Sequence, residues 1–168
     1  MNHSILTELA RALTREDFIE RLPDPVLVVM SEIIAEEKSG EDDTQVGEQV
    51  EGTPRRTLTK IPDAFETLAV RKKRHNEDKQ RITLGRERTC DIVVRTPGVS
   101  KLHAHFIPGR KLELVDRGSH NGTFVGDRRL VPEEPAAVQP GVQITFGDLV
   151  TKLVSPEELY VLLKTRRS

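Results

Sequence analysis

The fold is decided by residues 81–125, which read RITLGRERTCDIVVRTPGVSKLHAHFIPGRKLELVDRGSHNGTFV. Short runs rich in β-branched residues alternate here with clusters of Gly, Pro, Asn and Asp. This pattern is typical of short strands joined by tight turns, at the spacing of an all-β sandwich or barrel. A parallel α/β fold is excluded, because the segments between successive runs are too short to contain a crossover helix.

The same pattern continues on both sides of this stretch. The predicted strands are Glu66–Arg71, Arg81–Leu84, Asp91–Val94, Leu102–Ile107, Lys111–Val115, Thr123–Val125, Val142–Phe146 and Leu149–Val154. After the last strand, Ser155 and Glu158 have the spacing of a capping box, and Pro156 occupies the first helical position. We therefore expect a short helix at the C-terminal end of the sheet region.

The first residues predict a small helical element. Thr14 can cap a helix whose third position is Asp17, and Pro23 would end it. The apolar run Val26–Met30 is either a short strand or the start of a further helix, because so short a run has no diagnostic period. Both alternatives stay open at this stage.

Between Glu36 and Thr59 apolar residues are scarce, and Gly, Thr, Glu and Asp accumulate. Such a segment buries too little surface to offset its ordering entropy, so residues 36–60 are predicted to be an acidic flexible linker. The expected organisation is a partly helical N-terminal segment (1–35), this linker, a β domain (61–154), and a C-terminal helix with its tail (155–168). Residues 1–60 carry 7 Lys/Arg and 13 Asp/Glu, whereas residues 61–168 carry 19 and 14.

The composition limits the classes of function. The 26 basic and 27 acidic residues nearly cancel, which favours neither nucleic acid nor a membrane surface as a partner. The single cysteine, Cys90, cannot form an internal disulfide, so we expect a reducing compartment and a cytoplasmic location. The longest apolar run is far shorter than the roughly 20 residues that span a bilayer.

Three loop segments place polar side chains where a packed sandwich does not need them: Leu84–Arg86, Val99–His103 and Gly118–Thr123. The planar guanidinium of Arg86 can bind a phosphate through two parallel hydrogen bonds. The dipeptide Asn121-Gly122 is a strong turn signal, and an Asn amide can both donate to and accept from a peptide backbone. Taken singly, a Gly-Arg pair is more typical of an exposed surface arginine, and an Asn-Gly dipeptide is equally typical of an ordinary hairpin turn.

In this order and at these separations, the three segments resemble the forkhead-associated (FHA) domain, a β-sandwich that binds phosphothreonine peptides. The resemblance covers about residues 62–154 and implies an all-β, FHA-type sandwich. It implies that phosphopeptide contacts come from Arg86, Ser100, Lys101, His120 and Asn121. It further implies that the loops are supported by Gly85, His103, Ser119 and Gly122. His120 stands where many relatives carry a different polar residue.

The resemblance implies a phosphothreonine-binding adaptor whose partner is a protein phosphorylated by a Ser/Thr kinase. The alternative is an interaction or scaffolding module that does not depend on phosphorylation. Thr44, which follows three acidic residues in the linker, is a candidate phosphosite. Its phosphorylated form would compete for the domain of the same chain, or else the linker only solubilises the protein.

Other chemistries are disfavoured. The set Cys90, His103 and Asn121 superficially suggests a nucleophile with its base, but in an FHA fold these residues lie at a strand edge and in supporting loops, so no enzyme activity is expected. His103 and His105 lack a third ligand, so neither a metal nor a cofactor is expected. The basic run Arg71–His75 is interpreted as a solvated hairpin loop, with an acidic partner or nucleic acid as alternatives. A chain with one Tyr and no Trp offers few stacking aromatics for nucleic acid.

Overall fold

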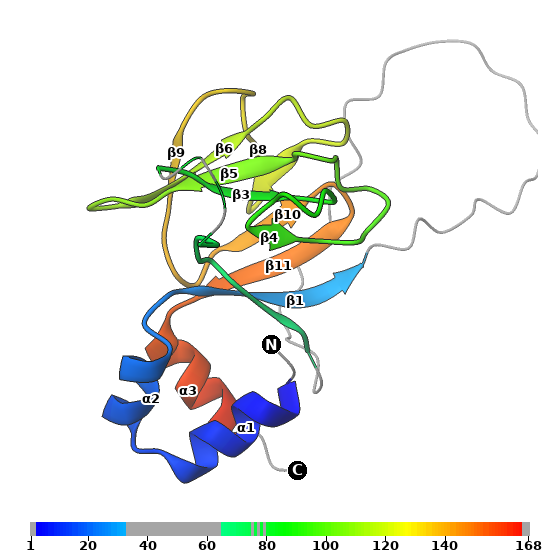
Figure 1. Ribbon diagram of the computed structural model, residues 1–168. Coiled ribbons are helices and arrows are strands. Elements are labelled where there is room, and N and C mark those ends of the chain that lie inside the picture. The colour runs from blue at the N-terminus through cyan, green and yellow to red at the C-terminus, as the bar shows by residue number, and fades with distance from the viewer. Residues whose placement is uncertain (1–2, 33–64, 75, 77, 79, 166–168) are drawn as a thin grey trace, which may run out of the picture.

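The computed structural model describes residues 3–32, 65–74, 76, 78 and 80–165. Figure 1 shows two sheets packed as a sandwich, with the helices gathered at one end. The first sheet has the order β2 (Thr67–Ala69), β1 (Val26–Glu32), β11 (Leu149–Val154), β10 (Gln143–Phe146), β7 (Thr123–Val125) and β8 (Arg128–Arg129). The second has the order β4 (Ile92–Val93), β3 (Ile82–Gly85), β5 (Ala104–Ile107), β6 (Leu112–Asp116) and β9 (Ala136–Val138).

The predicted all-β sandwich with a C-terminal helix is confirmed. Each of the eight predicted strands has a counterpart in the two sheets; β7 and β11 have the predicted bounds, β3 and β6 are shifted by one residue, and the other four are shorter than predicted. β3 and β4 pair in parallel, and the other pairings of the described strands are antiparallel. The strands β8 and β9 were not predicted. β8 consists of two exposed arginines, and β9 has only one buried residue, so neither shows the apolar alternation that marks a strand.

The ambiguous run Val26–Met30 is a strand. It pairs with β11 from Val26↔Val154 onward, and with β2 from Val26↔Ala69. Leu27 and Val29 belong to the core between the sheets, whereas Val26 and Val28 pack against the helices. Because both faces of this strand are buried against apolar groups, its sequence does not alternate between apolar and polar residues.

A second, smaller core lies between the first sheet and α1 (His3–Ala12), α2 (Arg15–Arg21) and α3 (Pro156–Thr165). The predicted cap of α2 is present, with the Asp17 backbone N–H donating to Thr14 Oγ1 at 3.2 Å. The Ser155 and Glu158 pair forms the reciprocal capping box before α3, at 2.9 and 3.2 Å. Among the described residues, no helix is both long and apolar enough to cross a bilayer.

The predicted division of the chain needs one change. β1 was placed in the N-terminal segment 1–35, yet it is an interior strand of the first sheet. A boundary at residue 61 therefore cuts through the sandwich, because sheet pairing joins residues 26–32 to residues 67–69 and 149–154. The predicted linker, residues 36–60, and Thr44 lie outside the described residues.

Candidate functional site

The three predicted loop segments meet at one end of the second sheet. They connect β3 to β4, β4 to β5, and β6 to β7. The Arg86 backbone N–H donates to the Ser100 carbonyl at 3.0 Å, and the Glu87 N–H donates to the Lys101 carbonyl at 3.1 Å. A Cβ atom on Gly85 would lie 2.0 Å from the Lys101 carbonyl oxygen, so only glycine allows this approach of the two loops.

Arg86 is exposed at this junction, and its side chain is anchored at one point. The Nε atom donates to the Val99 carbonyl at 2.5 Å. Within the described residues, no carboxylate lies within ion-pair distance of this guanidinium. The Nε bond therefore orients the guanidinium, and the terminal NH₂ groups can still donate to a ligand. An oxyanion that binds through two parallel hydrogen bonds needs donors arranged in this way.

Ser100 and Asn121 stand beside this arginine. Ser100 is half-buried, and its Oγ accepts from the His120 backbone N–H at 3.1 Å. Since that bond uses a lone pair, the hydroxyl hydrogen can still be donated to a ligand. Asn121 Nδ2 donates to the Gly98 carbonyl at 3.0 Å, which joins the second and third loops. The side chains of Lys101 and His120 are exposed at the rim of the same site.

His103 lies fully buried beneath the loops and joins two of them. Its Nδ1 accepts from the Ser100 backbone N–H at 3.0 Å, so Nε2 carries the hydrogen that faces the Gly122 carbonyl at 3.2 Å. Its ring packs edge-on against Phe146, with centroids 5.9 Å apart. Burial lowers the pKa of His103, although the Gly122 carbonyl and the nearby Asp116 oppose the shift, and the imidazole is neutral. Through these contacts His103 joins the second and third loops from beneath.

Asp116 is a supporting residue that the sequence analysis missed. This buried carboxylate accepts from the Ser119 backbone at 3.0 Å, from the Ser119 hydroxyl at 2.6 Å, and from the Thr123 hydroxyl at 2.5 Å. Burial raises the pKa of Asp116, but the hydrogen bonds from Ser119 and Thr123, together with nearby His103, outweigh burial and lower the pKa overall. The three-residue spacing from Asp116 to Ser119, typical of a carboxylate-capped turn, was the available signal.

Arg129 adds a further cation to the site besides Arg86 and Lys101, and no sequence signal marked it. Gly122 has a φ of +81°, and a Cβ atom there would lie 2.7 Å from Arg129 Nε. The guanidinium also lies 5.8 Å from the ring centroid of Phe124. β8 therefore places an exposed arginine against the Asn121-Gly122 turn.

Cys90, His103 and Asn121, which were considered as a catalytic set, make other contacts in the structure. Cys90 is buried, its Sγ donates to the Lys101 carbonyl at 3.4 Å, and burial raises the pKa of its thiol. A thiol with a raised pKa is a poor nucleophile. Both ring nitrogens of His103 are engaged with backbone groups, and neither serves this thiol. In the part of the chain that the structure describes, no three His, Cys, Asp or Glu residues are placed to hold a metal ion.

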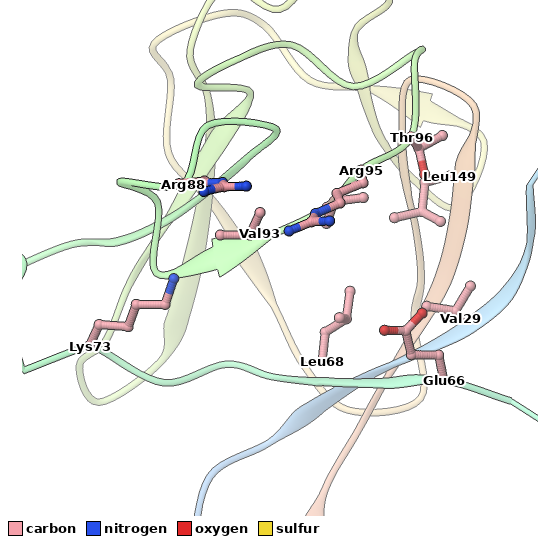
Figure 2. A pocket seen from close by; sticks show the side chains of 10 residues that line it. Val29, Glu66, Leu68, Lys73, Arg88, Val93, Arg95, Thr96 and Leu149 are labelled. Atoms are coloured by element: carbon pink, nitrogen blue, oxygen red, sulfur yellow. The ribbon is translucent and has the colours of Figure 1, made fainter. Parts of the chain in front are cut away.

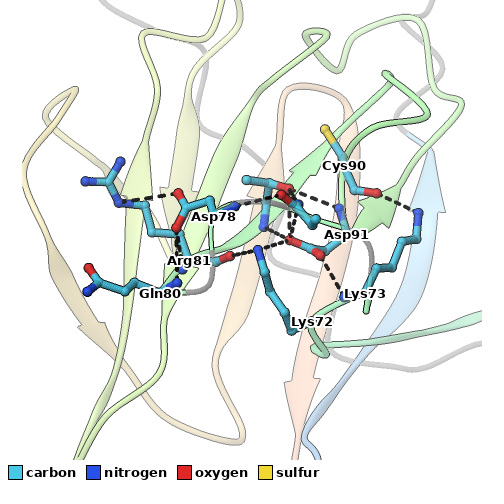
Figure 3. A network of polar contacts seen from close by, with 9 residues as sticks. Lys72, Lys73, Asp78, Gln80, Arg81, Cys90 and Asp91 are labelled. Atoms are coloured by element: carbon cyan, nitrogen blue, oxygen red, sulfur yellow. Dashed lines mark hydrogen bonds and ion pairs between the residues drawn. The ribbon is translucent and has the colours of Figure 1, made fainter.

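The basic run lies in a surface segment between β2 and β3, where Arg71, Lys73 and Arg74 are exposed as a solvated loop would have them, but both of its lysines also contact the sandwich. Figure 3 shows the Lys72 side chain directed toward the buried Asp91 and the Lys73 side chain directed toward Cys90. Lys72 Nζ lies 3.0 Å from the carboxylate, the Lys73 backbone N–H donates to it at 2.7 Å, and Lys73 Nζ donates to the Cys90 carbonyl at 2.6 Å. Asn76 and Thr83 complete the set of donors to Asp91. Two of the basic residues thus fasten this segment to the sandwich, and His75 lies outside the described residues.

A two-sheet sandwich in which three loops of one sheet build a cationic, hydroxyl-bearing site has the architecture of an FHA domain. The FHA domain family model matches residues 82–147, and the chain contains an FHA domain. The chain is similar to the protein phosphatase 1 regulatory inhibitor subunit PPP1R8 homolog of Arabidopsis thaliana, with 35% identity over 73 residues. It is also similar to the DNA damage response protein kinase DUN1 of Saccharomyces cerevisiae, with 32% identity over 74 residues.

These matches cover 42% and 39% of this chain but only 20% and 14% of the two relatives. Among solved structures, the chain is similar to the FHA domain of CT664 from Chlamydia trachomatis, with 18% identity, a TM-score of 0.46, and coverage of 78% of this chain and 97% of that one. It is also similar to the N-terminal FHA domain of S. cerevisiae RAD53P, solved with a phosphothreonine peptide. That match has 22% identity, a TM-score of 0.42, and coverage of 50% and 74%.

Proposed function

We propose that this chain is an adaptor that binds a phosphothreonine segment of a partner protein, itself the substrate of a Ser/Thr kinase. The observation that carries the proposal is Arg86, whose Nε is fixed to the Val99 carbonyl while its terminal NH₂ groups remain for a ligand. The Ser100 hydroxyl and the Asn121 turn lie near Arg86, because hydrogen bonds from His120 to Ser100 and from Asn121 to Gly98 hold the loops together. A dianionic phosphate would be held by Arg86 and Ser100, with Lys101 adding charge at the rim.

The proposal also assigns roles to Asn121 and His120. Asn121 would hold the extended main chain of the ligand, because its amide can both donate and accept. His120 would contact the ligand at the rim. The preference for phosphothreonine over phosphoserine is carried over from FHA domains and is part of the proposal.

The test uses the full chain and an array of phosphothreonine peptides to find a binding sequence. Isothermal calorimetry then compares the phosphorylated, unphosphorylated and phosphoserine forms of that peptide. Arg86→Ala should weaken binding by at least about 2 kcal/mol, and Ser100→Ala by about 1 kcal/mol, as losses of charge-assisted and neutral hydrogen bonds do.

The matched control is Arg110→Ala. Arg110 is an exposed arginine in the turn between β5 and β6, whereas the site lies before β5 and after β6, at the opposite ends of these strands. This variant should bind like the parent chain. Equal affinity for the phosphorylated and unphosphorylated peptides would refute the proposal and favour an interaction module that does not depend on phosphorylation.

A further inference from the structure

A second groove, separate from the phosphate site, lies where the two sheets open at their edges. It has a volume of about 760 Å³ and is lined by β2 and β4, the terminal strands of the two sheets. Figure 2 shows its apolar floor, to which Val29, Leu68, Val93 and Leu149 contribute. The groove is thus a partly apolar channel between two edge strands, a place where an extended chain can lie.

The groove is also cationic on its β4 side. Figure 2 shows the guanidinium groups of Arg88 and Arg95 directed toward each other across Val93. Within the described residues, neither makes a hydrogen bond or an ion pair. Lys73 adds a third positive charge, although its ammonium already donates to the Cys90 carbonyl. The carboxylate of Glu66 is the acidic group among the lining residues, so the groove carries a net positive charge.

The described residues on either side of residues 33–64 lie next to lining residues of this groove, because Glu32 pairs with Leu149 and Phe65 precedes Glu66. The Val29 N–H donates to the Glu66 carbonyl at 2.8 Å, and both residues line the groove. The chain leaves the described structure after Glu32 and returns at Phe65. Residue 36 is four residues beyond Glu32, a span of about 14 Å at most.

The charge of this segment is complementary to the groove. Residues 36–51 carry seven acidic residues and one basic residue, a net charge of −6. Val46 and Val50 alternate there with Glu48 and Glu51, so apolar and acidic side chains are interleaved. Because the segment is tethered to the domain, its effective concentration is on the order of millimolar. Even a weak contact between complementary charges is then formed in a substantial fraction of the molecules.

We propose that residues 36–51 bind the groove of their own chain, with the acidic side chains on Arg88 and Arg95 and the valines on the apolar floor. This contact does not involve Arg86, Ser100 or Asn121. The proposal is therefore independent of phosphothreonine binding, and it can be tested without any phosphopeptide.

The test is paramagnetic relaxation in NMR spectra of the full chain. A nitroxide is attached at Gln45→Cys in a Cys90→Ser background, and the amide signals of Leu68, Val93 and Thr96 are followed. They should broaden at low salt and recover at high salt, because the contact is electrostatic. The broadening should be lost in Arg88→Glu/Arg95→Glu. It should persist in the control Arg110→Glu/Arg128→Glu, which reverses two exposed arginines outside the groove.

Charge reversal of the segment provides the complementary test. Glu41→Lys/Asp42→Lys/Asp43→Lys should also abolish the broadening, and combining it with Arg88→Glu/Arg95→Glu should restore it. Broadening that survives Arg88→Glu/Arg95→Glu, or that is uniform over the surface, overturns the proposal. So does broadening seen only when spin-labelled and isotope-labelled chains are mixed, because it would place a second copy in the groove.

Limited proteolysis tests the same proposal on the chain that keeps Cys90, in case the Cys90→Ser variant does not fold. A Glu-specific protease cleaves after Glu48 and Glu51 when these residues are accessible. Cleavage should be several-fold faster in Arg88→Glu/Arg95→Glu than in the parent chain or in Arg110→Glu/Arg128→Glu. Equal rates in all three proteins overturn the proposal.

Discussion

Replacing His103 with alanine should destabilise the fold and weaken ligand binding together. The change leaves the Ser100 N–H and the Gly122 carbonyl without their partner, and it removes the ring that packs on Phe146. Each unsatisfied buried group costs about 1–3 kcal/mol, so the loss is about 2–6 kcal/mol before the cavity is counted. For a chain of this length, the melting temperature should fall on the order of 10 °C.

The assay combines circular dichroism melting with calorimetry of phosphopeptide binding, the latter at a temperature where the variant is folded. His120→Ala is the control, because His120 is exposed at the rim and supports no loop. The control should keep its melting temperature. A His103→Ala protein that melts like the parent chain but has lost affinity would refute the reasoning and make His103 a ligand contact.

The pKa of His103 supplies a second readout. Because burial lowers this pKa below its ordinary 6.5, the unfolded chain takes up the proton more readily than the folded one. The stability contributed by the neutral ring is complete above pH 6.5 and decreases as the pH falls below that value. His103→Gln should therefore reduce the loss of stability between pH 7.5 and pH 5.5. It should not abolish that loss, because burial also lowers the pKa of His105. An unchanged pH dependence of the urea midpoint would contradict this account.

Two further predictions concern residues outside the site. Asp91→Ala should lower the free energy of unfolding, measured by urea denaturation at pH 7, by about 3–5 kcal/mol. The change leaves Lys72 and four other donor atoms around a buried position without their acceptor. A loss below about 1 kcal/mol would mean that the network contributes little to stability. Phosphorylation of Thr44 in vitro should weaken binding of an external phosphothreonine peptide, because the tethered phosphate competes for Arg86. Unchanged peptide affinity after mapped modification of Thr44 would refute this competition at the phosphate site.

Local patterns were sufficient for most of the sandwich and for the loops of the site. Strand alternation, the Asn121-Gly122 turn and the two helix caps involve residues close together in the chain, and their energetics depend mainly on near neighbours. The Arg86, Ser100 and Asn121 segments were recognisable because FHA-like spacing places loops on a known scaffold. The short distance between Gly85 and the Lys101 carbonyl gives the physical reason for the glycine in that pattern.

Other features depend on contacts between distant residues, which no local pattern encodes. Val26–Met30 could be assigned only after its two faces were seen to pack on two different cores. Lys72 and Lys73 appeared to be solvated charges, because the acceptors of their ammonium groups, the Asp91 carboxylate and the Cys90 carbonyl, lie 19 and 17 residues away in the sequence.

The sequence by itself determined the sandwich, the helix caps, and the identity of the three loops. The tertiary structure alone decided that β1 belongs to the sandwich, that Asp116 supports the third loop, and that Arg129 lies against the Gly122 turn. It also decided that Arg88 and Arg95 line one groove together with Glu66 and Leu149. The physical reason is that turns, caps and strands are governed by neighbouring residues, whereas buried polar partners and surface grooves arise from the packing of segments far apart in the chain.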